Sequence, residues 1–153
     1  MNMPDTVTLR VSGKSANATR TDTTAGRHTL VMDEPELRHG NDEGMLPLQA
    51  LMCSLAGCSN VIANWIARDL GIEIRDMSFD IAATLDTRCI AGVEHAGPPF
   101  PEIDFAVEVT TTGTEDQIAE LQEQLRWRCP VAATFHLAGT AINERWTVHS
   151  VPA

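Results

Sequence analysis

An uncharged stretch of twenty residues, Leu48–Ala67, constrains the fold of this chain most. Pro47 suits the first turn of a helix, where its missing N–H costs no hydrogen bond, and Gly71 is typical of a helix end. The sequence therefore predicts a helix from about Leu46 to Leu70. It is long enough to span a membrane, but it carries five Gln, Ser and Asn residues that are costly in lipid, so we favour a central helix in a soluble protein and expect no membrane partner. Because the helix is apolar nearly all round, we expect two copies to pack as a homodimer.

Before this helix, alternating polar and apolar residues predict a three-stranded antiparallel meander. The expected strands are Val7–Val11, Ala18–Thr24 and His28–Met32, with turns at Gly13-Lys14 and Ala25-Gly26. A polar loop, Asp33–Gly44, then leads to the helix.

After the helix, Ile72–Asp86 alternates in two registers, which predicts a β-bulge near Asp76. A second strand follows at Ile103–Val109. A capping box at Thr114–Gln117 begins a helix that ends near Arg128. The remaining predicted elements are a short segment, Val131–Leu137, closed by Gly139, and a last strand, Ile142–Val151. This order predicts an α+β fold, mainly antiparallel, as one domain over residues 1–153.

The charge of the chain argues against one class of function. The sequence has 21 acidic against 11 basic residues, and its only lysine is Lys14. Because nucleic-acid-binding proteins cluster lysine and arginine, we expect no nucleic acid as a partner. The chain begins without a basic segment leading into an apolar one, which predicts no signal peptide and a cytoplasmic location. The sequence contains no P-loop, dinucleotide-binding or serine-hydrolase motif.

Two of the four cysteines have settings that suggest chemistry. Cys58 lies between Gly57 and Ser59 in the uncharged helix, and it is either a small buried apolar residue or a reactive thiol activated by a cation from elsewhere. Cys129 precedes Pro130, so it is either a coincidental helix cap or a thiol whose pKa is lowered by a helix N-terminus and by the arginines before it.

The other two cysteines give no metal site. Cys53 and Cys58 point to different faces of a helix. Cys89 and His95 share a loop, but two candidate ligands do not close a structural site. We therefore expect no bound metal.

Three sequence patterns together resemble the OsmC/Ohr family, which comprises osmotically inducible protein C and the organic hydroperoxide resistance proteins. They are the Asp33-Glu34-Pro35 loop with its later glycines, the Ser54–Cys58 segment SLAGC, and Cys129-Pro130-Val131. The resemblance covers about residues 6–149. It implies an intertwined homodimer with antiparallel sheets around long central helices.

The resemblance also implies an activity, the thiol-dependent reduction of organic hydroperoxides. Cys58 would attack the peroxide, Cys129 would resolve the resulting sulfenic acid, and a dithiol reductant would restore both thiols. No metal, haem or flavin cofactor is implied. The apolar helix suits a small apolar hydroperoxide.

In the family an arginine activates the thiol and a glutamate holds the arginine. Arg27, after the small residues Ala25-Gly26, matches the arginine best, and Arg20 is the alternative. The glutamate position holds Leu48 here, so Gln49 or Glu43 would have to replace it. This departure resembles an OsmC-like branch of the family. It keeps two other functions open: a non-enzymatic dimer that binds a small ligand, and a different cysteine-based redox or sulfur reaction.

Overall fold

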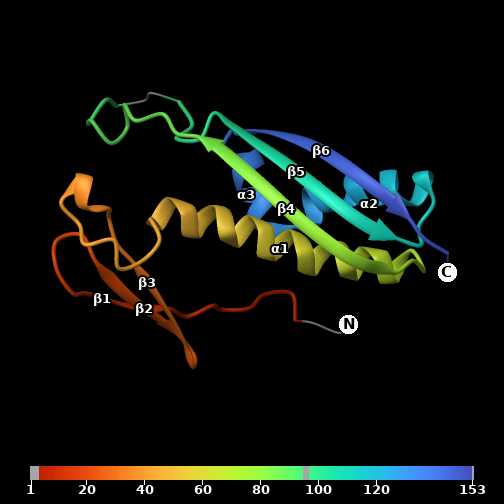
Figure 1. Ribbon diagram of the computed structural model, residues 1–153, viewed down its shortest axis with the longest axis horizontal. Coiled ribbons are helices and arrows are strands. Elements are labelled where there is room, and N and C mark those ends of the chain that lie inside the picture. The colour runs from red at the N-terminus through yellow and green to blue at the C-terminus, as the bar shows by residue number, and fades with distance from the viewer. Residues whose placement is uncertain (1–3, 95–96, 153) are drawn as a thin grey trace. The chain divides into compact units, whose positions relative to one another are not determined.

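The computed structural model describes residues 4–94 and 97–152 (Figure 1). The chain divides into two compact units, residues 1–51 and 52–153. Helix α1 (Pro47–Asp69) begins in the first unit and continues in the second. The elements follow the predicted order β-β-β-α-β-β-α-α-β, with one additional short 3₁₀ helix, η1 (Glu36–Arg38). The fold is α+β, as predicted from the sequence.

The first unit contains the predicted antiparallel meander, but its first strand was placed wrongly. The strands are β1 (Ser12–Ser15), β2 (Thr21–Ala25) and β3 (His28–Met32). Ser12 pairs with Thr24 near the end of β2, and the described residues before it, 4–11, have no partner strand within this unit. Val7–Val11 is therefore not a strand, and the Gly13-Lys14 turn is also wrong because both residues lie in β1. The turn at Gly26 is confirmed, with a φ of 60° that favours glycine.

The loop after β3 is organised by a buried carboxylate. Asp33 accepts hydrogen bonds from the backbone N–H groups of Glu34, Asn41 and Glu43 at 2.9, 3.1 and 3.3 Å. Two glycines permit the close approach of the backbone. A Cβ atom at Gly40 would lie 1.8 Å from the carbonyl oxygen of Glu34, and one at Gly44 would lie 2.4 Å from that of Val31. The pattern of an acidic residue followed by two glycines therefore has a steric cause.

The second unit contains a three-stranded sheet in the order β4 (Ile74–Thr84), β5 (Glu102–Thr111) and β6 (Ala141–Ser150). β4 and β5 are antiparallel, and the register shifts between Ile74 and Asp76, which confirms the predicted bulge. β5 and β6 are parallel, the exception among strand pairs that are otherwise antiparallel, as expected. The reason is that two helices between these strands carry the chain back to the edge where β5 begins.

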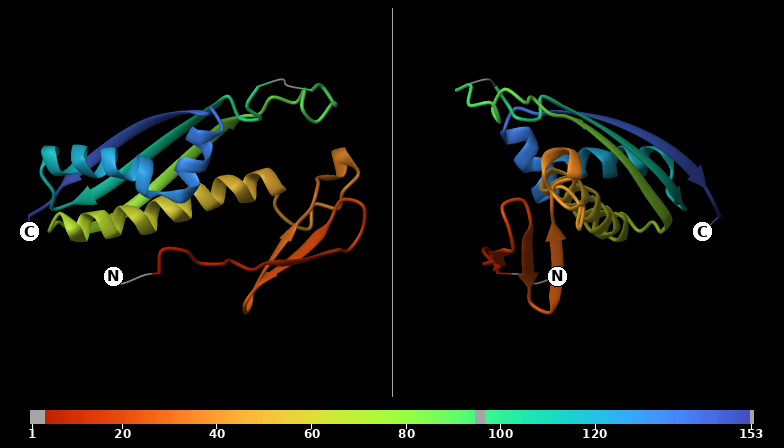
Figure 2. Two further views of the ribbon diagram at one scale, coloured as in Figure 1. Left: turned by 180° about the vertical axis from the view of Figure 1, so that it is seen from behind. Right: turned by 60° about the vertical axis from the view of Figure 1, so that its left-hand side comes forward.

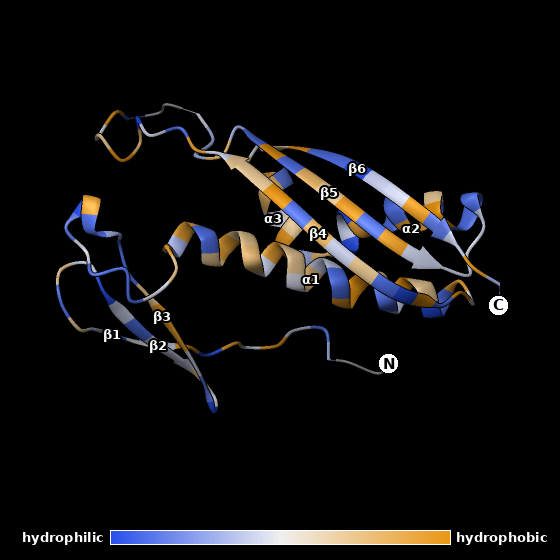
Figure 3. Ribbon diagram, viewed as in Figure 1, coloured by the Kyte–Doolittle hydropathy of each residue, from blue (hydrophilic) through white to orange (hydrophobic). Residues whose placement is uncertain are grey.

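The helices of the second unit lie on one face of this sheet (Figures 1 and 2). Along β5, four alternate apolar side chains are buried against them: Ile103, Phe105, Val107 and Val109. The alternation appears as bands of opposite hydropathy along β5 in Figure 3. Phe79 of β4 stacks on Phe105 with ring centroids 5.7 Å apart. β4 and β5 thus each turn one side toward the core, as a period of two requires.

Helix α1 is buried along one side only. Its buried residues are Leu55, Ser59, Ile62, Ala63, Ile66 and Ala67. Leu51 and Val61 remain 39% and 45% exposed, and no described residue comes within 4 Å of a Cβ built at Gly57. By length and composition α1 could also cross a membrane, but core helices of soluble proteins pass the same test.

Candidate functional site

Two cysteines far apart in the sequence meet between α1 and the end of α2. Cys58 projects from α1 and is partly exposed, whereas Cys129 is fully buried. Cys129 is the single residue between α2 (Glu115–Arg128) and α3 (Pro130–Leu137). The capping box of Thr114 and Gln117 fixes the start of α2, as predicted. Pro130 stops it, because proline lacks the N–H that a continuing helix needs.

The thiol of Cys129 lies close enough to the sulfur of Cys58 to change its pKa. The backbone N–H of Val131, in the first turn of α3, also donates to the Cys58 sulfur. Burial raises the pKa of the Cys58 thiol most, and the neighbouring Cys129 thiol raises it further, whereas the Val131 N–H lowers it. The net result is a pKa above the ordinary value for cysteine. These surroundings therefore favour the neutral thiol of Cys58, and a nearby cation would favour the thiolate.

The helix N-terminus of α3 acts on a different thiol from the one predicted. Cys129 occupies the N-cap position, but its sulfur makes no capping hydrogen bond. The two arginines expected to assist it are engaged elsewhere. Arg128 pairs with Asp69 at the end of α1 (2.9 Å), and Arg126 lies 3.7 Å from Glu144 of β6. The expected capping contact of Cys129 is thus not formed, and the backbone N–H of Val131 interacts with the Cys58 sulfur instead.

A serine completes the surroundings of the thiol pair. The hydroxyl oxygen of Ser59 lies 3.8 Å from the Cys129 sulfur, and both side chains are fully buried. This contact was not predicted from the sequence. Ser59 follows Cys58 directly, but no sequence pattern indicates which residue lies opposite it.

The arginine candidates both belong to the first unit. Arg27 lies exposed in the turn between β2 and β3. Arg20 pairs with Asp22 at 2.7 Å and with Glu43 at 2.6 Å. Gln49 accepts a hydrogen bond from the backbone N–H of Leu46 at 3.0 Å and so caps the start of α1. Of the two residues considered as replacements for the family glutamate, Glu43 is therefore the one that holds an arginine.

The remaining cysteines lie apart from this site. Cys53 is exposed on α1, and Cys89 is exposed in the loop after β4, where its thiol donates to the carbonyl oxygen of Asp86 at 3.0 Å. His95, the other half of the metal pair considered from the sequence, lies outside the described residues. Among residues 4–94 and 97–152, no three His, Cys, Asp or Glu side chains are grouped so that they could hold a metal ion.

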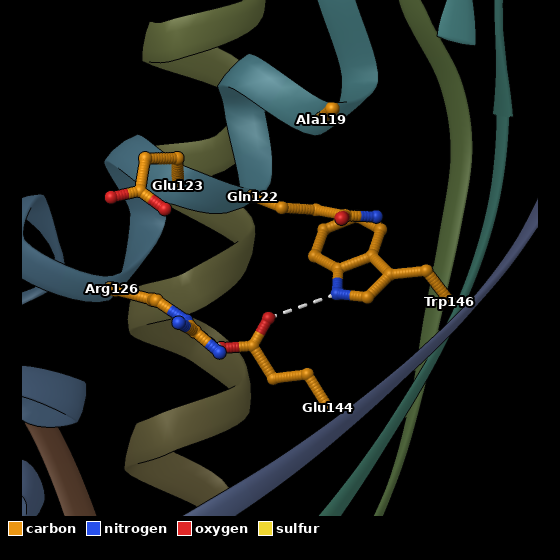
Figure 4. Close-up of a pocket in the computed structure, with 6 residues that line it drawn as sticks. All are labelled: Ala119, Gln122, Glu123, Arg126, Glu144 and Trp146. Carbon is orange, nitrogen blue, oxygen red and sulfur yellow. Dashed lines mark hydrogen bonds and ion pairs between the residues drawn. The ribbon is translucent and has the colours of Figure 1, made fainter. Parts of the chain in front are cut away.

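A groove between α2 and β6 is lined by Ala119, Gln122, Glu123, Arg126, Glu144 and Trp146 (Figure 4). Its volume is about 450 Å³. The Glu144 carboxylate lies between Arg126 and Trp146, and it accepts a hydrogen bond from the indole N–H at 3.0 Å. The carboxylate at the centre of the groove is thus already paired within the chain, so we assign no ligand to it.

A family model described as OsmC-like protein matches residues 40–145. The chain belongs to the OsmC-like family. No curated protein matches the sequence. The recognition made from the loop glycines and the two cysteine motifs is therefore confirmed.

Solved structures of this family share the fold. An OsmC-like protein from Mycoplasma pneumoniae superposes with a TM-score of 0.79 at 21% identity, over 94% of this chain and 98% of that one. An organic hydroperoxide resistance protein OsmC from Legionella pneumophila gives 0.63 at 18% identity, over 95% and 98%. An organic hydroperoxide resistance protein from Elizabethkingia anophelis gives 0.65 at 14% identity, over 97% and 100%. At these identities the OsmC-like fold is shared, and activity has to be argued from the residues.

Proposed function

We propose that this OsmC-like chain reduces organic hydroperoxides with Cys58 as the attacking thiol and Cys129 as the resolving thiol. The observation that carries the proposal is the contact between these two thiols, which lie seventy-one residues apart in the sequence. Two of the structural relatives are named organic hydroperoxide resistance proteins, which supports the same chemistry.

The proposed cycle balances without a metal or an organic cofactor. The Cys58 thiolate attacks one peroxide oxygen, the O–O bond breaks, and the alkoxide takes a proton to leave as an alcohol. Cys58 becomes a sulfenic acid, oxidised by two electrons. The Cys129 sulfur then attacks the Cys58 sulfur, and the sulfenic oxygen leaves as water. A dithiol reduces the resulting disulfide by two exchange steps and becomes a disulfide itself.

The surroundings of Cys58 raise the pKa of its thiol. The cycle therefore needs a nearby cation that favours the thiolate. We propose Arg20 for this role ahead of Arg27, the residue favoured from the sequence. Arg20 is held by two carboxylates, one of which is Glu43, and a fixed guanidinium orients a peroxide better than a mobile one. Arg27 in its exposed turn remains the alternative.

We further propose that the active form is a homodimer in the cytoplasm, acting as a single OsmC-like domain per chain. The exposed side of α1 and the exposed side chains of Val7, Leu9 and Val11 (69%, 88% and 67%) are apolar surface that a second copy would cover. The apolar residues Leu55 and Ile62 flank Cys58 on α1, which favours an alkyl hydroperoxide as substrate. The cytoplasm supplies the dithiol reductants that the cycle consumes.

A second candidate function is a dimer that binds a small ligand without turnover. It is favoured by the raised pKa of Cys58 and by Leu48 in place of the family glutamate. A third is a sulfur reaction that leaves a stable adduct on Cys58. Both would lack the oxidation of two thiols to a disulfide.

The test is turnover of an alkyl hydroperoxide with dithiothreitol, followed by mass spectrometry of the protein. We expect wild-type protein to lose two hydrogens after one equivalent of peroxide, Cys58→Ser to lose turnover, and Cys129→Ser to accumulate a sulfenic acid that dimedone traps. Cys53→Ser is the matched control on α1 and should keep full turnover. Unchanged turnover in Cys58→Ser would refute the proposal, and a stable mass adduct would favour the third candidate.

A further inference from the structure

The hydroxyl of Ser59 lies beside the proposed resolving thiol, but the peroxidase cycle described above gives it no role. Ser59 is fully buried, and its oxygen lies 3.8 Å from the sulfur of Cys129, which is also fully buried. A hydrogen bond to sulfur is longer than one between oxygen atoms, so this separation is compatible with a contact in which either atom donates.

Packing alone does not call for a hydroxyl here. The neighbouring buried positions of α1 are apolar residues such as Leu55 and Ile62, and Ala63 shows that a small side chain without a polar atom also fits along this side. A buried hydroxyl is costly unless it has a hydrogen-bond partner. The partner of the Ser59 hydroxyl is the thiol of Cys129, which has to lose its proton during disulfide formation.

Consecutive residues of a helix point about 100° apart, so Cys58 and Ser59 approach Cys129 from two directions. Cys129 thus lies near two consecutive side chains of α1, the sulfur of Cys58 and the oxygen of Ser59. A hydroxyl that accepts the S–H hydrogen of Cys129 leaves the sulfur lone pairs free to face Cys58. The same hydroxyl can turn and donate once Cys129 becomes a thiolate.

We propose that Ser59 is a positioning residue for the resolving step: it orients the Cys129 sulfur toward Cys58 and stabilises the attacking thiolate. The inference rests on the proposed roles of the two cysteines. Ser59 is unchanged over the cycle. Cys129 releases its proton when its thiolate forms, the new bond joins the two sulfurs, and the displaced hydroxide takes up a proton to leave as water.

The resolving step can be measured without any peroxide. In a Cys53→Ser, Cys89→Ser protein, the aromatic disulfide dithiobis-nitrobenzoate reacts with Cys58 and releases one thionitrobenzoate. Cys129 then attacks the mixed disulfide on Cys58, which releases a second thionitrobenzoate and forms the Cys58–Cys129 disulfide. The two releases are followed by absorbance in a stopped-flow instrument, and the final disulfide is checked by mass spectrometry.

We expect Ser59→Ala to slow the second release about tenfold, the loss expected for one hydrogen bond, and to leave the first release within about twofold of wild type. Ser59→Thr restores the hydroxyl and should recover most of the rate. Ser78→Ala removes an exposed hydroxyl from β4 and should change neither release. An unchanged second release in Ser59→Ala, or an equal slowing of both releases, would overturn the inference.

This experiment separates the inference from the proposed peroxidase function. If hydroperoxides fail to oxidise Cys58 but the second release still depends on Ser59, the peroxidase proposal fails and the role of Ser59 stands. If turnover with hydroperoxide is normal and Ser59→Ala closes the disulfide at the wild-type rate, the reverse holds. The thermal midpoint of Ser59→Ala is measured alongside, because a general loss of packing would slow both releases together.

Discussion

The backbone N–H of Val131 donates a hydrogen bond to the sulfur of Cys58. This contact connects the first turn of α3 to a thiol on α1, and it favours the thiolate over the thiol. It acts against burial and against the adjacent Cys129 thiol, both of which favour the neutral form. The reactivity of Cys58 is therefore set by a competition that mutations can shift.

Replacing Cys129 should lower the pKa of Cys58, because the Cys129 thiol is one of the groups that raise it. The measurement is the rate of Cys58 alkylation by iodoacetamide as a function of pH, with the site identified by mass spectrometry. In Cys129→Ser the profile should move to lower pH. Cys53→Ser, an exposed cysteine on the same helix, should leave it unmoved, and a shift of Cys129→Ser to higher pH would contradict the assignment.

Arg20 and Arg27 can be separated by the same alkylation profile and by hydroperoxide turnover. If Arg20 is the activating cation, Arg20→Ala should move the Cys58 profile to higher pH and reduce turnover at least about tenfold. Arg27→Ala is the matched control from the turn between β2 and β3, and it should retain turnover. Glu43→Gln, which keeps the shape but removes one carboxylate from Arg20, should give an intermediate loss. The opposite ranking of the two arginines would restore Arg27 to the role.

Gly40→Ala should destabilise the loop after β3 by at least about 2 kcal/mol, because its Cβ would overlap the carbonyl of Glu34 and the backbone itself must move. Chemical denaturation followed by circular dichroism gives the change in free energy of unfolding. Gly13→Ala is the control, since its Cβ would lie at ordinary contact distances of 3.5 and 3.6 Å from threonine methyl groups. Equal stability of Gly40→Ala and wild type would rule out this backbone approach.

The carboxylate of Asp33 should stabilise the first unit at neutral pH and stop doing so in acid. Burial raises its pKa, but hydrogen bonds from the Thr19 hydroxyl and from three backbone N–H groups outweigh burial, and the folded pKa lies below its ordinary value of 3.8. The stabilisation is therefore complete above the unfolded pKa and is lost as the pH falls through the folded pKa. Asp33→Asn should melt at a lower temperature than wild type at pH 7, and the difference should shrink toward pH 3. A difference that stays constant with pH would contradict the carboxylate's role.

The apolar side chains before β1 offer a test of the homodimer. Val7, Leu9 and Val11 alternate with polar residues, so an extended segment presents all three on one side. We expect light scattering to give a mass near twice 16.6 kDa, and Leu9→Asp to weaken the dimer at least about tenfold. Leu37→Asp, at an equally exposed leucine in η1, should have no effect. A monomeric wild-type protein at micromolar concentration would refute the dimer.

Local sequence signals predicted most helix boundaries because the residues that fix them are adjacent in the chain. The capping box at Thr114 and the proline at position 130 each act within one turn. The bulge near Asp76 was likewise visible as a change in alternation. By contrast, the strand expected at Val7–Val11 has the right alternation but no partner within its unit, and alternation cannot reveal which residues will be paired.

The candidate site was predictable only in part for the same reason. Cys58 and Cys129 were identified from motifs, but the contact that places Val131 and Ser59 around them depends on how α1, α2 and α3 pack. Cys129 was expected to interact with the α3 N-terminus because the two are adjacent in sequence. In three dimensions the residue opposite the N–H group is Cys58, which no local pattern indicates.

The position of Cys129 between α2 and α3 has a consequence for the energetics of oxidation. A bond between Cys58 and Cys129 would close a loop of seventy-one residues that includes β4, β5 and α2, and it would restrict the unfolded chain by roughly 4 kcal/mol of entropy. Oxidation of the pair would therefore be expected to raise the melting temperature. The heat resistance of the protein would then report how much of it is in the disulfide form, and the balance between the two forms could be read from a melting curve.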